Sequence, residues 1–181
     1  ILASCNNNKS SDGADTGKKT PVNPNQMING VQEMEKQKEE LGKLTPIPLE
    51  QLEAMAPETL LGASRTNLDV NAAMGAGVAT ADYELNENSS ATLTIVDCAG
   101  PGGAGIYSLQ YLGLINIKED NEEEFTRTVD YNGGKAFEHC DKTTNDCAFT
   151  YFAGGRFLVT LEAANTSVNE LRKAADGLNI R

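Results

Sequence analysis

The sequence predicts an α+β fold in which an antiparallel β-sheet of about six to seven strands has one face covered by helices. Short runs of alternating polar and apolar residues fill much of the second half of the chain. They are separated by Asn132-Gly133-Gly134 and Gly154-Gly155, which tolerate positive φ and so close β-hairpins. Helical spacing of apolar residues is found near the start, in the middle and at the end. Consecutive hairpins give an antiparallel sheet, and helices with one apolar side must pack against it.

The first part of the expected domain, residues 27–56, is predicted to be helical. Apolar residues recur at helical spacing from Met27 to Leu44, with Glu and Lys between them. Thr45-Pro46-Ile47-Pro48 ends this helix, because proline lacks an N–H donor and restricts the residue before it. Leu49 to Ala56 predicts a second, short helix, which Pro57 ends.

Residues 57–181 are expected to hold the sheet and two further helices, so that 27–181 form a single domain. From Ser64 onward the alternation predicts two or three strands, including the hairpin Val78–Leu85 and Ala91–Asp97. A helix is expected near 106–115. Four strands in a meander follow, at 124–131, 135–142, 147–153 and 156–162. The last helix is expected at 167–178, with Thr166 or Ser167 as its cap.

Length and charge exclude some classes of function. The chain has 181 residues, which suits one domain and a tail. It carries 15 Lys and Arg against 26 Asp and Glu, a formal net charge of −11. An acidic surface repels phosphate backbones, so nucleic acid is not expected as a partner.

The start of the chain indicates export and lipidation. Ile1-Leu2-Ala3-Ser4-Cys5 resembles the lipobox of bacterial lipoproteins, in which a Leu and two small residues precede a Cys at the end of an apolar signal segment. The resemblance implies that residues 1–4 are a remnant of a signal peptide and that the Cys5 thiol carries a lipid. It implies a membrane-anchored protein of the bacterial cell envelope, facing the periplasm or the cell exterior.

Residues 5–26 are expected to be the lipidated cysteine and a flexible tether. They are rich in Asn, Ser, Gly, Lys, Thr and Pro, and such a run cannot bury enough apolar surface to offset the entropy lost on ordering.

The glycine-rich segment Gly100-Pro101-Gly102-Gly103-Ala104-Gly105 has the literal pattern of a dinucleotide-binding loop. The strands after it are expected in hairpins rather than in parallel βαβ units, and Pro101 fixes φ where such a loop needs freedom. A tight turn from strand to helix is the favoured interpretation, and no cofactor is expected.

Cys140 and Cys147 stand on either side of a polar turn between two strand-like runs. Cysteines facing each other across a hairpin have the short Cα separation that a disulfide requires, and an exported protein meets an oxidising compartment. The alternative is a metal site formed by His139 and both cysteines. Three ligands on one hairpin are few for zinc, which normally takes four, so we expect the disulfide and no metal.

Cys98 is then left unpaired and is expected to be buried. Its alternative role is that of a catalytic nucleophile, which needs a base. His139 is the only histidine in the chain, so this alternative is an extracytoplasmic hydrolase or redox enzyme built from Asp97, Cys98 and His139.

The segment from Pro57 to Leu178 resembles a group of small exported bacterial proteins with no assigned activity. The residues that carry the likeness are Pro57-Glu58-Thr59-Leu60-Leu61-Gly62, Arg65-Thr66, Ala73-Met74-Gly75, Ala79, Ala81, Tyr83, Ile95-Val96-Asp97 and Gly155-Arg156-Phe157-Leu158-Val159. The resemblance implies an α+β domain and lends no catalytic residue to this chain. The expected function is therefore that of a lipid-anchored, non-enzymatic envelope domain that binds a partner, protein or ligand, through its sheet or a loop.

Overall fold

The computed structural model describes residues 24–114 and 117–180. The expected signal-peptide remnant and the tether up to residue 23 lie outside this range. Helix α1 (Pro24–Lys43) begins three residues earlier than expected, inside the segment assigned to the tether. Pro24 is its first residue, a position where proline loses no hydrogen bond and its fixed φ already suits the helix.

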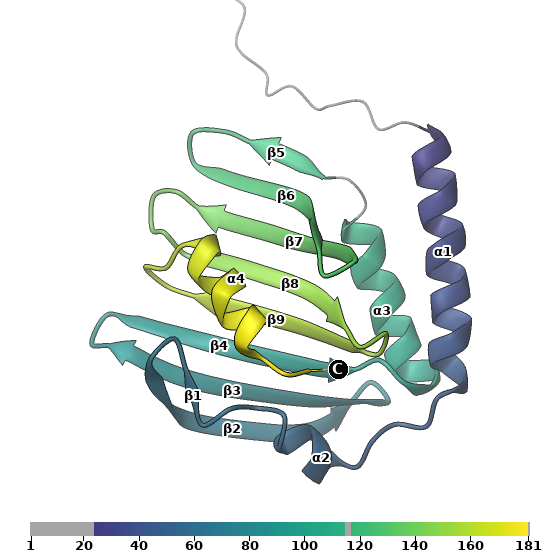
Figure 1. The fold of residues 1–181 in the computed structure, drawn as a ribbon, viewed down its shortest axis with the longest axis horizontal. Coiled ribbons are helices and arrows are strands. Elements are labelled where there is room, and N and C mark those ends of the chain that lie inside the picture. Colours follow the sequence, from purple (N-terminus) through teal and green to yellow (C-terminus); the bar gives the residue numbers. More distant parts are fainter. Residues whose placement is uncertain (1–23, 115–116, 181) are drawn as a thin grey trace, which may run out of the picture.

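Nine strands of the described chain form one antiparallel sheet, which confirms the α+β class but exceeds the expected six to seven strands (Figure 1). Two of the nine, β1 (Thr59–Leu60) and β5 (Lys118–Asp120), are too short to show an alternating pattern. The others are β2 (Ala63–Ala73), β3 (Ala76–Asn86), β4 (Ser89–Asp97), β6 (Glu124–Tyr131), β7 (Gly134–Asp141), β8 (Cys147–Ala153) and β9 (Phe157–Ala163).

The strand order is β1-β2-β3-β4-β9-β8-β7-β6-β5, so the sheet consists of two meanders that meet at its centre. Helix α3 (Gly100–Leu114) follows β4, and the chain then enters β5 at the far edge of the sheet. The second meander returns strand by strand until β9 pairs with β4, in a register that joins Ile95 to Val159.

Helices lie on both faces of the sheet, which corrects the expectation that only one face is covered. Helix α4 (Val168–Gly177) packs on one face, called here the α4 face, against a core that includes Tyr83, Phe149 and Leu161. Helices α1 and α3 pack on the other, the α1/α3 face, over Val96 and Leu158. Figure 1 shows α1 and α3 together at one end of the sheet, away from α4.

Helix α2 (Leu49–Glu53) is shorter than the expected Leu49–Ala56 and lies beside the first meander, where Leu52 joins the core of the α4 face. Helix α4 begins as expected. Ser167 accepts a hydrogen bond from the backbone N–H of Glu170, and the Glu170 carboxylate accepts one from the backbone N–H of Ser167. This reciprocal capping box satisfies two donors that the helix itself leaves unpaired.

The glycine-rich segment forms the first turns of α3, not a turn that precedes the helix. A Cβ on Gly102 would lie 2.3 Å from the carbonyl oxygen of Met74, and one on Gly103 would lie 2.5 Å from the carbonyl carbon of Cys98. The start of α3 therefore touches the backbone of the β2–β3 turn and the backbone at the end of β4. Glycine is required here for this close approach.

Asp97 and Arg156 form a buried ion pair where three segments meet. The Asp97 side chain has no solvent exposure, and Nε and Nη2 of Arg156 donate to its two oxygens at 2.8 and 2.9 Å. The backbone N–H groups of Ile47 and Ala99 donate to the same carboxylate at 2.8 and 3.1 Å, and Arg156 also donates to the carbonyl of Thr45. The pair thus joins the α1–α2 connection, the end of β4 and the β8–β9 turn.

A second buried carboxylate holds the α4 face. The side chain of Glu138 on β7 is fully buried and pairs with Arg127 of β6, at 2.6 Å, and with Arg172 of α4. Arg172 also lies over the ring of Phe149, with its guanidinium carbon 5.9 Å from the ring centre. Because a buried charge is costly without a partner, these contacts fix α4 on the sheet.

Gly102→Ala should lower the free energy of unfolding by about 1–3 kcal/mol, because the new methyl group meets fixed backbone atoms. Gly105→Ala, three residues further along α3, is the matched control. A Cβ there meets nothing within 4 Å, so alanine should leave stability unchanged or raise it by up to about 1 kcal/mol. Urea unfolding of both variants measures the difference. Equal effects of the two substitutions would contradict the close packing of α3 on the β2–β3 turn.

Candidate functional site

Part of the α1/α3 face is left uncovered by the described helices. The apolar cluster beneath α1 and α3 takes in Val96, Cys98 and Leu158, all at the end of the sheet where α3 begins. Toward the other end of the same strands this face becomes polar. Thr94 and Thr160 are half-buried there and Glu162 is exposed. We call this uncovered region the polar face.

The strand register arranges the polar face in three rows. The first row contains Asp69, Thr80, Thr94, Thr160, Thr150, Phe137 and Thr128; the second contains Asn67, Asp82, Thr92, Glu162, Ala148, His139, Thr126 and Glu119; the third contains Glu84, Ser90, Asp146, Asp141 and Glu124. Each row brings together residues from both meanders. No Lys or Arg occurs at these positions, whereas carboxylates occur in every row. The polar face is therefore a surface of negative charge.

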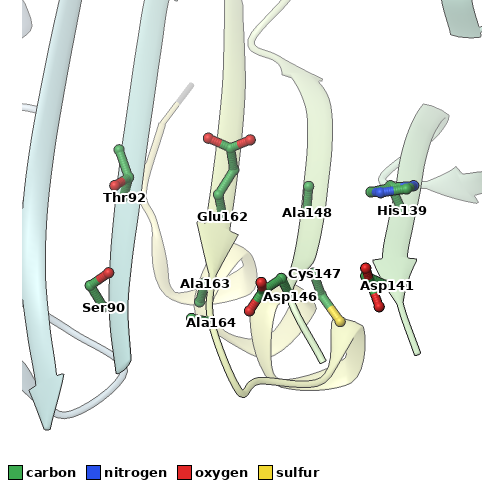
Figure 2. Close-up of a pocket in the computed structure, with 10 residues that line it drawn as sticks. All are labelled: Ser90, Thr92, His139, Asp141, Asp146, Cys147, Ala148, Glu162, Ala163 and Ala164. Atoms are coloured by element: carbon green, nitrogen blue, oxygen red, sulfur yellow. The ribbon is translucent and has the colours of Figure 1, made fainter. Parts of the chain in front are cut away.

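The polar face has a hollow of about 410 Å³ above Ala148 (Figure 2). In the second row Ala148 lies between Glu162 and His139, so a methyl group separates two longer side chains. Asp141 and Asp146 line the hollow at the end of the β7–β8 hairpin. The small residue forms the floor, and the longer ones form polar walls.

Hydrogen bonds hold several of these side chains in place. His139 Nδ1 lies 2.8 Å from the hydroxyl of Thr126, and its Nε2 lies 4.0 Å from the Glu124 carboxylate. The backbone N–H groups of Thr144 and Thr143 donate to Asp141 and lower the pKa of that carboxyl. Asp141 is therefore ionised at neutral pH.

Asp82 is fixed in the same way on the first meander. Its carboxylate accepts a hydrogen bond from the Thr92 hydroxyl at 3.0 Å and one from the Asn67 amide at 3.1 Å. The negative charge of the polar face is therefore partly preorganised, which lowers the entropy that a ligand must remove on binding.

A second hollow, of about 430 Å³, lies on the α4 face. Arg127, Asn145, Asn165, Ser167 and Asn169 contribute to its lining. Cys147 lines both hollows, so the β7–β8 hairpin separates them. Amides and hydroxyls line this second hollow together with the apolar side chains of Phe125 and Val168.

Cys140 and Cys147 lie directly opposite each other on β7 and β8, with Cα atoms 4.1 Å apart and sulfur atoms at bonding distance. This geometry is consistent with the predicted disulfide. The metal alternative is not supported. Neighbouring residues on a strand point to opposite faces, so His139 points away from Cys140. The described residues contain no group of three His, Cys, Asp or Glu side chains placed to hold a metal ion.

Cys98 is fully buried and unpaired, as predicted. Burial raises the pKa of its thiol to about 12, so the thiol stays protonated at neutral pH and is a poor nucleophile.

The structure does not bring Asp97, Cys98 and His139 together. His139 on β7 is in register with Thr92 on β4, three strands away across the sheet. Cys98 lies six residues after Thr92 in the chain. Standard sheet spacings therefore separate His139 from Cys98 by roughly 14 Å across the strands and roughly 20 Å along them. Asp97 is already bonded to Arg156. A thiol and base this far apart cannot exchange a proton directly.

The local sequence patterns pointed to Cys98, Cys140, Cys147 and His139 but not to the polar face. Alternation along a strand places every second residue on the same face, and Asp82 of β3 reaches the polar face in this way. The sequence carries no signal that β9 pairs with β4, and this pairing places Glu162 next to Thr92.

Comparisons with family models, curated proteins and solved structures found no significant match to this chain. Among the described residues, no helix has both the length and the apolar character needed to cross a membrane.

In the Cys5→Ser chain, Cys98 should resist alkylation in the native state and react once the protein is denatured without reductant. Cys140 and Cys147 should react only after reduction, because their sulfurs are joined. Mass spectrometry of the peptides measures each site. A Cys98 peptide linked to either other cysteine would contradict the pairing, and alkylation of Cys140 and Cys147 without reductant would contradict the disulfide.

Proposed function

We propose that this protein is a non-enzymatic binding domain of the bacterial cell envelope, anchored to a membrane by a lipid on Cys5. Its binding surface is the polar face. The observation that supports this best is a region of the sheet that the described helices leave open, with carboxylates in every row and a hollow above Ala148.

The state of the candidate catalytic residues supports binding rather than catalysis. The Cys98 thiol is buried, with a pKa raised to about 12, and the Asp97 carboxylate is occupied by Arg156. His139 lies in the polar face, bonded to Thr126. Asp97 and Cys98 therefore belong to the folded core, and His139 belongs to the polar face.

The proposed anchor is strong enough to hold the domain at a membrane surface. Several acyl chains on one cysteine give stable attachment, which a single chain does not.

Cys5→Ser should release the protein from membranes when it is produced in a bacterial host with a complete lipoprotein signal sequence. The acyl chains provide the anchor, so their loss should move the protein to the soluble fraction in a flotation gradient. Cys98→Ser is the matched control, and it should still float with membranes. A Cys5→Ser protein that floats as the wild type does would contradict the proposed anchor.

A further inference from the structure

We propose that the hollow above Ala148 receives the cationic side chain of a Lys- or Arg-rich segment of a partner protein. This proposal rests on the proposed function, which makes the polar face a binding surface, and it adds the chemistry of the partner.

The charge of the polar face selects a cationic partner. Carboxylates of Glu162, Asp141 and Asp146 line the hollow, and the rows around it carry further acids without a Lys or Arg. Two nearby lysines are already paired. Lys135 of β7 pairs with Asp130 at 2.6 Å, and Lys142, which directly follows β7, pairs with Asp120 at 2.5 Å. The negative potential over the hollow therefore remains available, and such a potential steers partners of opposite charge.

The shape of the hollow suits the end of one long side chain. The floor is the methyl group of Ala148 on β8. Glu162 on β9 and His139 on β7 lie on either side of it. Neighbouring strands are about 4.8 Å apart, so the two walls start roughly 10 Å from each other. An ammonium or guanidinium group placed between them can donate to carboxylates, in hydrogen bonds stronger than those between neutral groups.

Other occupants fit less well. A second copy of this chain would bring like charges together across the interface, which is unfavourable. Nucleic acid and anionic lipid are repelled for the same reason. The described residues offer no metal-binding group.

The test uses the full chain with Cys5→Ser and a fluorescein-labelled, capped peptide of alternating Lys and Ser. Glu162→Gln with Asp146→Asn should weaken binding about tenfold in an anisotropy titration. Glu35→Gln with Glu40→Gln, on exposed positions of α1, removes the same charge elsewhere and should change the affinity less than about twofold. Ala148→Leu, which fills the hollow without a change of charge, should weaken binding about as much as the first pair. Thermal melts verify that each variant is folded.

Equal weakening by the two charge-matched pairs would show a general attraction to an acidic protein and would overturn the proposal. Wild-type affinity in Ala148→Leu, or equal binding of a matched Glu–Ser peptide, would overturn it as well. A photo-crosslinking residue in place of Thr92, in the lipidated protein in cells, tests the polar face as a binding surface separately from the cationic character of the partner. The same residue in place of Asn169, on the α4 side, is the control. A partner captured through Thr92 but not Asn169, together with no binding of the Lys–Ser peptide, rejects the cationic partner and leaves the proposed function standing. No capture through Thr92 counts against the proposed function itself.

Discussion

The ion pair of Asp97 and Arg156 is the interaction on which the rest of the structure depends. Asp97 is fully buried, and its carboxylate accepts hydrogen bonds from Arg156 and from the backbone of Ile47 and Ala99. Burial by itself would raise the pKa of Asp97, but these hydrogen bonds, together with the positive charge of Arg156, lower it below its ordinary value. A buried charge that loses its partner costs about 3–5 kcal/mol. The pair therefore holds the α1–α2 connection, the end of β4 and the β8–β9 turn together strongly.

The location of this pair explains why the described helices cover only one end of the α1/α3 face. The pair fixes the segment after α1 to the end of β4, and α3 begins three residues later at Gly100, close to Pro46. Both helices are therefore held at one end of the sheet. On the opposite face Glu138 holds α4 through Arg172. Among the described residues, therefore, no helix covers the polar face.

Much of the fold could be predicted from local patterns. The turns at Asn132-Gly133 and Gly154-Gly155 and the alternation between them predicted β6 to β9, and the Ser167 cap predicted α4. The start of α3 was missed because glycines normally indicate a turn, whereas Gly102 and Gly103 are required by contacts with distant backbone. The polar face was missed for a similar reason. It depends on the pairing of β4 with β9, and no local pattern encodes which distant strands become neighbours.

The dependence of the fold on the Asp97–Arg156 pair is tested most directly by the unfolding free energy of Asp97→Asn as a function of pH. Because the folded pKa of Asp97 is lowered, its carboxylate contributes stability above its unfolded pKa of about 3.9, and this contribution is lost as the pH falls through the folded value. We expect Asp97→Asn to lose about 3 kcal/mol or more at neutral pH and to show a weaker pH dependence than the wild type below about pH 4. Asp130→Asn, at an exposed ion pair, should change stability by less than about 1 kcal/mol. If Asp97→Asn unfolds as the wild type and Asp130→Asn do, the buried pair does not hold the helices in place.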